Sequence, residues 1–455
     1  MDAKQVRECS DPPLGIGSLA KSRRWLILAV AATGFLFDTY ELLIQGIVVR
    51  PALIEFNFQP GTRDFNAWVG WLLFLPSFAG GVAGLAGGWL TDRLGRRPVL
   101  VWSLVIYGVA TAGAACATSV PQLFAWRCIT LVGVSTEWIA ATAIIAELFE
   151  DRRQRDAALG FSQAMGGLGV LLVGVAYFIS ARYGSSWPAI QGTHAAWRYA
   201  LMIGAVPVVP VLIARFFMPE SAPWRALKAA GAVCRPSFAE LFRPTLRRTT
   251  IVSVMLVAFI YAAGFGALQH MPRIIPGLVE IRALPANEQE QVIGLVITSQ
   301  DLGSLIGRFT MAALLVFWLG RRRVLRGFQW LALIFLPSLF LAAPHLDVGI
   351  LAFMVLLCGV IYNGQINFIG NYLPQAYPTH LRGVGESFAI SVGGRMLGTS
   401  AALFAPWLAN FTSGNGPAQK LAIAAAIVAA IACAAGIVTS AFLVEPRQNQ
   451  AKEIP

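Results

Sequence analysis

The feature that most limits the fold of this chain is a series of twelve apolar segments, each long enough to cross a lipid bilayer as a helix. Within a bilayer the backbone must satisfy its own hydrogen bonds, so segments of this kind form helices. Charged residues make up 13% of the chain, against roughly 25% in soluble domains. The sequence therefore predicts an all-α membrane protein with twelve transmembrane helices. They are expected at 25–49, 66–90, 98–118, 121–148, 156–182, 197–217, 248–272, 289–318, 324–343, 347–375, 383–410 and 418–444.

A polar, proline-containing segment in the middle of the chain separates six apolar segments from six. Short motifs recur across this division, as when Leu94-Gly95-Arg96-Arg97 is echoed by Leu319-Gly320-Arg321-Arg322. Transporters built from repeated halves show such internal symmetry and bind substrate between the halves. We therefore expect two pseudo-symmetric six-helix bundles. The predicted parts are a tail at 1–24, an N-terminal bundle at 25–217, a linker at 218–247, a C-terminal bundle at 248–444 and a tail at 445–455.

The distribution of basic residues predicts the orientation of the chain. With the amino terminus inside, cytoplasmic segments carry 24 of the 35 Lys and Arg, external loops carry 7, and 4 lie within helices. By the positive-inside rule this excess places both termini in the cytoplasm, so the net charge of +12 records topology and does not indicate a nucleic-acid partner. We expect a multi-pass protein, of the inner membrane if the source is bacterial.

Several other classes of protein are disfavoured by the sequence. The six cysteines are scattered without metal-ligand spacing, and no nucleophile elbow or phosphate-cradling loop is present. We therefore expect no enzyme activity, no metal and no cofactor. The stretch Met1–Arg24 lacks the apolar core of a signal peptide, so we interpret it as a cytoplasmic tail.

The segment Gly88-Trp-Leu-Thr-Asp-Arg-Leu-Gly-Arg-Arg97 joins the second and third apolar segments. It resembles the G-x-x-x-D-R-x-G-R-R loop signature of the major facilitator superfamily in every fixed position. The resemblance implies a cytoplasmic gating network that braces neighbouring helices. We assign to it Gly88, Asp92, Arg93, Gly95, Arg96, Arg97, Glu147, Arg152, Arg308 and Arg382.

Two further motifs resemble one branch of that superfamily, the sugar porters and the organic-acid:proton symporters of aromatic-acid and sialate or lactate type. One is Arg127-x-x-x-x-x-Gly-x-x-x-Glu137-Trp138 in the fourth segment, and the other is Pro219-Glu-Ser-Ala-Pro-Trp-Arg225 after the sixth. The resemblance implies that helices one, four, seven and ten line a central cavity and that three, six, nine and twelve face lipid. It also implies a small-molecule substrate, movement by alternating access, and a monomer in the lipid bilayer.

Charged residues inside a membrane are costly and therefore indicate function. Asp38 and Glu41 are three residues apart on one face of the first helix. Counted from the helix ends, Glu41 and Arg127 lie at depths that differ by about 3 Å at 1.5 Å per residue, so they can form an ion pair. Pairing with arginine favours an ionised carboxylate and separation favours a protonated one. We predict proton coupling by Glu41, Asp38 and Arg127; the alternative is a fixed structural pair.

Arg395 lies near the middle of the eleventh helix among glycines, and arginine can bind a carboxylate through two hydrogen bonds. We predict that it anchors the substrate; the alternative is that it neutralises Asp301 of the eighth helix. Arg308, seven residues after Asp301, is expected at the inner gate rather than in the site. The predicted substrate-binding residues are Arg395, Glu137, Trp138, Tyr40, Tyr261, Gln269, Asn363, Gln365, Asn367 and Asp301.

These observations together predict a proton-coupled symporter of a small organic solute, and an organic acid in particular. A sugar or polyol symporter is the main alternative, supported by the amides of helix ten. A drug:proton antiporter and a nutrient sensor that no longer transports are weaker alternatives. The fifth helix lacks the proline of the antiporter motif, and the tails carry no signalling extension.

Overall fold

The computed structural model describes residues 21–148, 152–206, 208–209, 211, 220, 225, 238–317, 321–378 and 381–444. Within them the chain is almost entirely helical, as predicted, and Ile190 and Thr193 form an isolated β-bridge. The first six predicted segments correspond to α1 (Lys21–Leu43) with α2 (Gln45–Glu55), α3 (Arg63–Leu94), α4 (Arg96–Ala115), α5 (Val120–Leu148), α6 (Arg152–Tyr183) and α7 (Ala196–Ala205).

The second half repeats this arrangement with two interrupted helices. Its main helices are α10 (Arg247–Gly266), α11 (Met271–Ile274), α12 (Ala286–Phe317), α13 (Arg321–Ala342), α14 (Val348–Ala376), α15 (Arg382–Phe388), α16 (Ala401–Leu408) and α17 (Pro417–Ser440). Short 3₁₀ turns connect several of them: η1 (Gly184–Ser186), η2 (Phe238–Phe242), η3 (Leu268–His270), η4 (Ile275–Gly277), η5 (Ala343–His345) and η8 (Gly398–Ser400). A π-helical segment, η7 (Ala389–Leu397), lies between α15 and η8.

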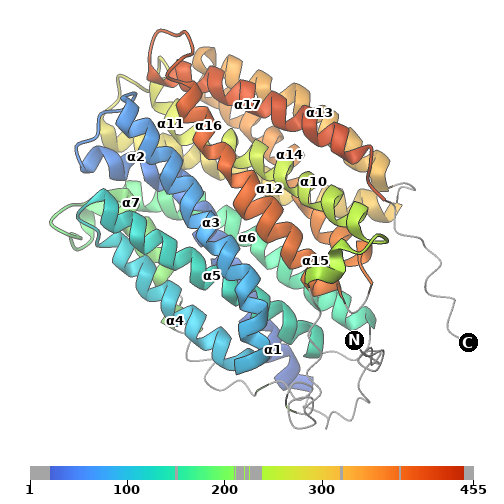
Figure 1. The fold of residues 1–455 in the computed structure, drawn as a ribbon. Helices are drawn as coiled ribbons and strands as arrows, with labels where there is room; N and C mark the ends of the chain where they lie inside the picture. The colour runs from blue at the N-terminus through green and yellow to red at the C-terminus, as the bar shows by residue number, and fades with distance from the viewer. Residues whose placement is uncertain are drawn as a thin grey trace, which may run out of the picture.

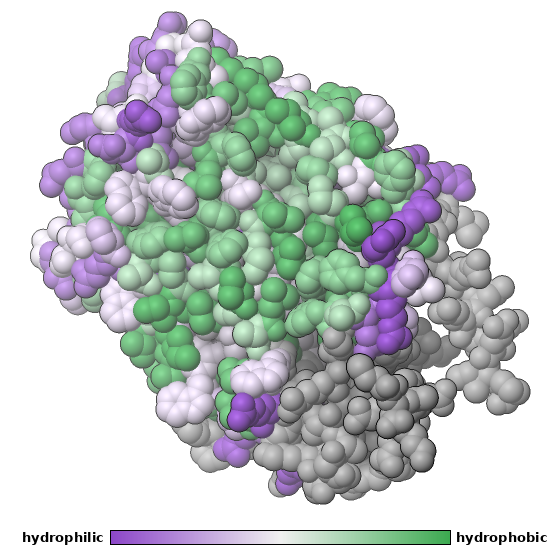
Figure 2. Space-filling view, in the orientation of Figure 1, coloured by the Kyte–Doolittle hydropathy of each residue, from purple (hydrophilic) through white to green (hydrophobic). Residues whose placement is uncertain are grey.

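Eight of the described helices are long and apolar enough to span a membrane, or nine if α1 and α2 together form one span. The helices run roughly alongside one another, with α1–α7 on one side and α10–α17 on the other (Figure 1). Figure 2 shows an apolar belt around the middle of the visible surface and hydrophilic residues toward its ends. A soluble protein rarely exposes so large an apolar surface, so the belt is the surface that contacts lipid.

Three of the predicted spans deviate from a single regular helix. The first bends by 45° between α1 and α2, at Ile44. The seventh stops at Gly266 and continues through η3 and α11, where Pro272 cannot supply the backbone N–H that a continuous helix needs. The eleventh passes through the π-helical segment η7 that carries Arg395, and such segments occur often at functional sites.

Three of the four helices that the family resemblance implied to face lipid have large exposed apolar side chains. Large apolar side chains are exposed on α4, α13 and α17, for example Trp102, Ile334 and Ile431. These helices are the third, ninth and twelfth spans. In the described residues none of them contributes to the central cavity, whose lining comes from the other spans.

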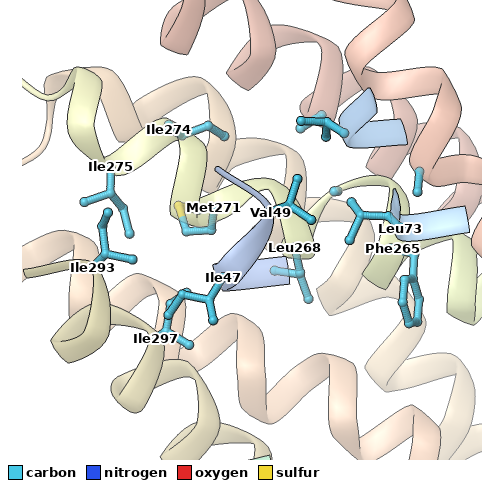
Figure 3. Close-up of a cluster of buried hydrophobic side chains, with 14 of the residues drawn as sticks. Ile47, Val49, Leu73, Phe265, Leu268, Met271, Ile274, Ile275, Ile293 and Ile297 are labelled. Carbon is cyan, nitrogen blue, oxygen red and sulfur yellow. The ribbon is translucent and has the colours of Figure 1, made fainter. Parts of the chain in front are cut away.

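Each half has a separate hydrophobic core, and a third core is shared between the halves. The separate cores lie within 27–211 and 241–443, while the shared core joins residues of α1–α7 to residues of α10–α17. Figure 3 shows Ile47 of α2 among Leu268, Met271 and Ile297 of the second half. The shared core is at the end of the molecule where α2 finishes at Glu55, which we call the Glu55 end. The opposite end, where α3 turns into α4 at Gly95, is the Gly95 end.

Candidate substrate cavity and its polar residues

A cavity lies between the two halves, and shared-core residues such as Ile47 and Leu268 form part of its wall. First-half residues of α1, α5 and α6 line it together with second-half residues of α10, α12, α14 and the eleventh span. The predicted lining helices one, four, seven and ten, which are α1, α5, α10 and α14, all contribute. Its polar and aromatic lining includes Thr39, Trp138, Tyr261, Gln269, Gln300, Asp301, Ser304, Arg308, Tyr362, Asn363, Glu386 and Arg395.

Arg395 extends into this cavity from η7. Only 6% of its surface is exposed, and its Nη1 atom has no hydrogen-bond partner among the described residues. Gly394 allows the ring of Tyr261 to approach the backbone of η7, since a methyl group on that glycine would lie 3.1 Å from the ring. The π-helical turn and its glycines therefore place a buried guanidinium beside an aromatic ring, at the surface of the cavity.

Asp301 also lines the cavity but does not neutralise Arg395. Its Oδ2 atom accepts a hydrogen bond of 3.2 Å from the backbone N–H of Gly174, on α6 of the other half. A close approach makes this contact possible, because a methyl group on Gly174 would lie 2.6 Å from the backbone nitrogen of Thr298. The alternative in which Asp301 pairs with Arg395 is therefore wrong for this structure.

Arg308 lines the cavity, whereas we expected it at the inner gate rather than in the site. Its Nε atom is buried without a hydrogen-bond partner in the described structure. The side chain passes Gly167 of α6, where a methyl group would lie 3.2 Å from the Arg308 Cδ atom. Because Arg308 and Asp301 are two helical turns apart on the same face of α12, both are directed into the cavity.

The predicted pair of Glu41 and Arg127 is confirmed, but it lies outside the cavity. Arg127 Nη1 donates to Glu41 Oε2 at 2.7 Å and Nη2 donates to the Glu41 carbonyl oxygen at 2.5 Å; both side chains are fully buried. Nearby Tyr40 donates to the carbonyl oxygen of Ala200 at 2.6 Å. This face of α1 is therefore directed into the first half, and neither Glu41 nor Arg127 lines the cavity between the halves.

Asp38 lies one turn before Glu41 and is also buried, with 1% of its surface exposed. It interacts electrostatically with Arg395 of the other half. Asp38 is therefore the acid of α1 that is coupled to the cavity, although it is not part of the cavity wall.

Four predicted substrate residues do not line the cavity: Tyr40, Glu137, Gln365 and Asn367. On α14 the cavity face is formed by residues 362, 363, 366, 369 and 370, a stripe with helical spacing, and positions 365 and 367 fall on either side of it. Gln365 donates to the carbonyl oxygen of Ile361 at 3.4 Å, and Asn367 to that of Arg308 at 3.0 Å. On α5, Trp138 reaches the cavity while its neighbour Glu137 is fully buried.

The remaining predicted substrate residues do lie in the cavity wall. Asn363 donates to the Ser304 hydroxyl at 2.7 Å, so this amide is already partly satisfied. His270, which follows Gln269, is fully buried and neither ring nitrogen has a partner among the described residues. The predicted substrate residues that line the cavity are Trp138, Tyr261, Gln269, Asp301, Asn363 and Arg395.

The predicted gating loop forms a tight turn. Gly95 has φ = +106°, which favours glycine, and it ends α3 and begins α4. Arg96 donates from Nη1 to the Thr91 carbonyl oxygen at 3.3 Å, and Arg93 lies 5.2 Å from the centre of the Trp89 ring. Five other residues of the predicted network lie outside the part of the chain that the structure describes in this detail: Gly88, Asp92, Glu147, Arg152 and Arg382.

Sequence reasoning did not predict the acid that caps α4. The Glu220 carboxylate accepts hydrogen bonds from the backbone N–H groups of Arg96, at 3.0 Å, and Arg97, at 3.3 Å. A carboxylate is favourable at the positive end of a helix. Glu220 belongs to the Pro219-Glu-Ser motif, and this motif was the signal that could have revealed the contact.

A polar contact between the halves at the Glu55 end was also missed. Arg50 of α2 donates to Glu290 of α12 at 2.8 Å, and Tyr177 of α6 donates to the same carboxylate. Asn66 donates to Asn410 at 3.1 Å in another contact across the seam. With the shared core, these contacts hold the halves together at the Glu55 end.

Comparisons with known proteins agree with this architecture. The chain is 28% identical over 316 residues to a probable 4-methylmuconolactone transporter of Cupriavidus pinatubonensis (strain JMP 134 / LMG 1197), covering 69% of this chain and 68% of the relative. It is 24% identical over 425 residues to a cis,cis-muconate transport protein of Acinetobacter baylyi, covering 91% and 95%. The crystal structure of a D-xylose-proton symporter superposes with a TM-score of 0.69 at 18% identity, covering 93% and 98%.

The model of the Major Facilitator Superfamily matches residues 26–394, more than three quarters of the chain. The twelve predicted spans, the arrangement in two halves and the central cavity are those of this fold. The chain is therefore a multi-pass membrane transporter that belongs to the Major Facilitator Superfamily.

Proposed function

We propose that this transporter is a proton-coupled symporter of organic carboxylates. The observation that carries the proposal is Arg395, a guanidinium in the cavity wall with an unpartnered Nη1 atom. The Asp38 carboxylate acts on it electrostatically, but Nη1 has no hydrogen-bond partner among the described residues. A buried N–H group without a hydrogen bond is costly, and a bound carboxylate removes that cost. The relatives named as transporters of muconate and methylmuconolactone support an acid as the substrate.

The shared core supports alternating access. The halves contact one another at the Glu55 end through apolar side chains and the Arg50–Glu290 pair, whereas each has its own core elsewhere. We propose that the Gly95 end is cytoplasmic, because the basic residues concentrate there. The structure then corresponds to a state closed to the outside. Substrate would enter after the Glu55 end opens, and both termini would lie in the cytoplasm of a bacterial cell, with the protein acting as a monomer.

Asp38 and Glu41 of α1 would carry the proton. An ionised Asp38 would repel a carboxylate held by Arg395, so we propose that Asp38 is neutralised by a proton when the substrate binds. Glu41 is shielded by Arg127 in this state. We propose that opening of the Glu55 end rearranges α1 and α2 at the bend at Ile44, separates Glu41 from Arg127 and exposes Glu41 to protons from outside.

Two assays in proteoliposomes test the proposal. The first compares the uptake of aromatic and aliphatic carboxylates with that of their amides and with sugars. Carboxylates should be transported and their amides should not. Equal transport of acids and amides, or transport of sugars alone, would contradict an acid substrate.

The second assay separates proton coupling from substrate binding. Glu41→Gln should abolish accumulation driven by a pH gradient while leaving exchange of labelled for unlabelled substrate. Asp38→Asn should affect accumulation in the same way. If Glu41→Gln reduces accumulation and exchange equally, Glu41 has only a structural role.

A further inference from the structure

The cavity wall contains two arginines, Arg308 and Arg395, and this pair carries an inference about the class of substrate. We propose that the two guanidinium groups bind the two ends of one dicarboxylate, with a hydrocarbon linker between its carboxylates. The inference rests on the proposed function, since it specifies which organic carboxylates the cavity prefers.

The two arginines share one cavity although they are on different helices. Arg308 is on α12 and Arg395 is in η7, and both line the cavity. Tyr261 of α10 interacts electrostatically with both of them. The guanidinium groups are therefore close enough to act on a single small molecule beside that tyrosine.

Both guanidinium groups have hydrogen-bonding capacity that the described protein leaves unused. Arg308 has an unpartnered Nε atom and Arg395 an unpartnered Nη1 atom, both buried. Arginine can hold a carboxylate through two parallel hydrogen bonds. One carboxylate would supply a hydrogen bond to one guanidinium and leave the unpartnered atom of the other as it is, whereas a dicarboxylate can supply a hydrogen bond to both.

The acids of the cavity do not occupy the two arginines. Asp301 accepts its hydrogen bond from the backbone of Gly174, and Glu386 forms no ion pair among the described residues. Asp38 acts on Arg395 electrostatically, whereas the electrostatic neighbours of Arg308 among the described residues are the hydroxyl groups of Tyr261 and Tyr362. Arg308 is therefore a second anion site, not the counter-ion of a fixed acid.

The surroundings of the arginines favour a hydrocarbon linker. The adjoining wall is formed by the aromatic rings of Tyr261, Phe265 and Tyr362 and by the aliphatic side chains of Ile366 and Ile390. Apolar and aromatic walls with a few placed polar groups are typical of sites for small organic ligands. The hydroxyl groups of a sugar acid would have no partners where they meet this part of the wall.

The test uses the purified full-length protein and a series of α,ω-dicarboxylates from succinate to suberate, with terephthalate as an aromatic member. Each is compared with its own monomethyl ester, which keeps the linker and removes one charge. Binding is measured by competition in the exchange assay and by ligand-induced thermal stabilisation. One linker length should bind best, and about 10–100-fold more tightly than its ester, as expected for a hydrogen-bonded charge.

Variants then assign the preference to the two arginines. Arg308→Gln and Arg395→Gln should each reduce the ratio of diacid to ester affinity to about one. Arg63→Gln removes an exposed arginine at the start of α3, remote from the cavity lining, and should leave the ratio unchanged. If Arg308→Gln does not fold, Arg308→Lys replaces it and should lower the ratio while retaining part of the preference.

Two results would overturn the inference: esters that bind as tightly as diacids, or a ratio that Arg308→Gln leaves intact. In either case transport of monocarboxylates would still support the proposed function. If no carboxylate of either kind binds and uncharged solutes do, the proposed function itself fails, and the two failures are thereby distinguished.

Discussion

Arg127 and Arg395 are both buried arginines in membrane-spanning helices, one in each half, but their environments differ. Arg127 is fully buried and holds both the side chain and the backbone carbonyl of Glu41. Arg395 lies in the cavity wall with part of its guanidinium unpartnered. Arg127 is paired with a carboxylate inside its own half, although its Nε atom has no partner among the described residues, whereas Arg395 lines the cavity, where a ligand can reach it.

The difference indicates that Arg127 contributes mainly to stability and Arg395 mainly to binding. Removing one partner of a buried ion pair is strongly destabilising, because the other charge remains buried. A guanidinium with an N–H group that lacks a hydrogen bond is already unfavourable in the empty protein, and its loss costs function instead. The two arginines should therefore respond in opposite ways to the same substitution.

The largest effect is expected from Arg127→Gln. It leaves the Glu41 carboxylate buried without its cation, which typically costs about 3–5 kcal/mol. The apparent midpoint of thermal unfolding in detergent should fall markedly. Arg395→Gln should leave that midpoint unchanged or raise it slightly.

The double variant Glu41→Gln/Arg127→Gln provides the control for the first prediction. It removes both charges together, so most of the lost stability should return, and a double-mutant cycle gives the coupling between the two residues. A double variant as unstable as Arg127→Gln would mean that the arginine acts through packing, and the comparison with Arg395 would lose its basis.

The sequence predicted the spans well, because length and apolar character alone define a membrane helix. It also predicted the pair of Glu41 and Arg127, since depth in the membrane follows from counting residues along straight helices. It could not show which way each face of α1 turns. That helix is apolar on most sides, so no stripe of polar residues distinguishes the face with Thr39 from the face with Glu41.

The same limit explains why we placed Gln365 and Asn367 in the cavity wall and Arg308 outside it, when the structure shows the reverse. Asn363, Gln365 and Asn367 are equally polar, yet only Asn363 falls on the stripe that lines the cavity. The direction of that stripe depends on how α14 packs against its neighbours, which a single sequence does not contain. The π-helical turn that directs Arg395 inward was likewise not predictable, because glycines permit such a turn without requiring it.

An intermediate effect is expected on binding. Arg395→Gln should weaken the affinity for a transported carboxylate by about 1.5–3 kcal/mol, the usual contribution of a hydrogen bond to a charged group. Binding is measured by isothermal titration with the purified protein. The matched variant Gln365→Leu changes a buried polar residue outside the cavity and should leave the affinity unchanged. An equal loss in both variants would show that affinity follows general stability, not contact with Arg395.

The smallest effect is expected at the Glu55 end, where two ion pairs of equal length differ in what they connect. Arg50–Glu290 joins the two halves at 2.8 Å, whereas Arg198–Glu55 joins α7 to α2 within the first half at 2.8 Å. Arg50→Gln should weaken the association of the two halves at this end by about 1 kcal/mol, the upper end of the range for exposed ion pairs. The population open at this end would then rise about fivefold.

Labelling of a cysteine placed at Ile293, in the shared core, measures this opening. The rate should rise in Arg50→Gln and stay at the starting value in Arg198→Gln, because the second pair does not cross the seam and its loss loosens only the first half. Equal acceleration in both variants would mean that labelling reports local unfolding of the Glu55 end and not the separation of two halves. Contacts across the seam would then matter no more for access to the cavity than contacts within one half. The polar contacts to Glu290 would not be what keeps the Glu55 end closed.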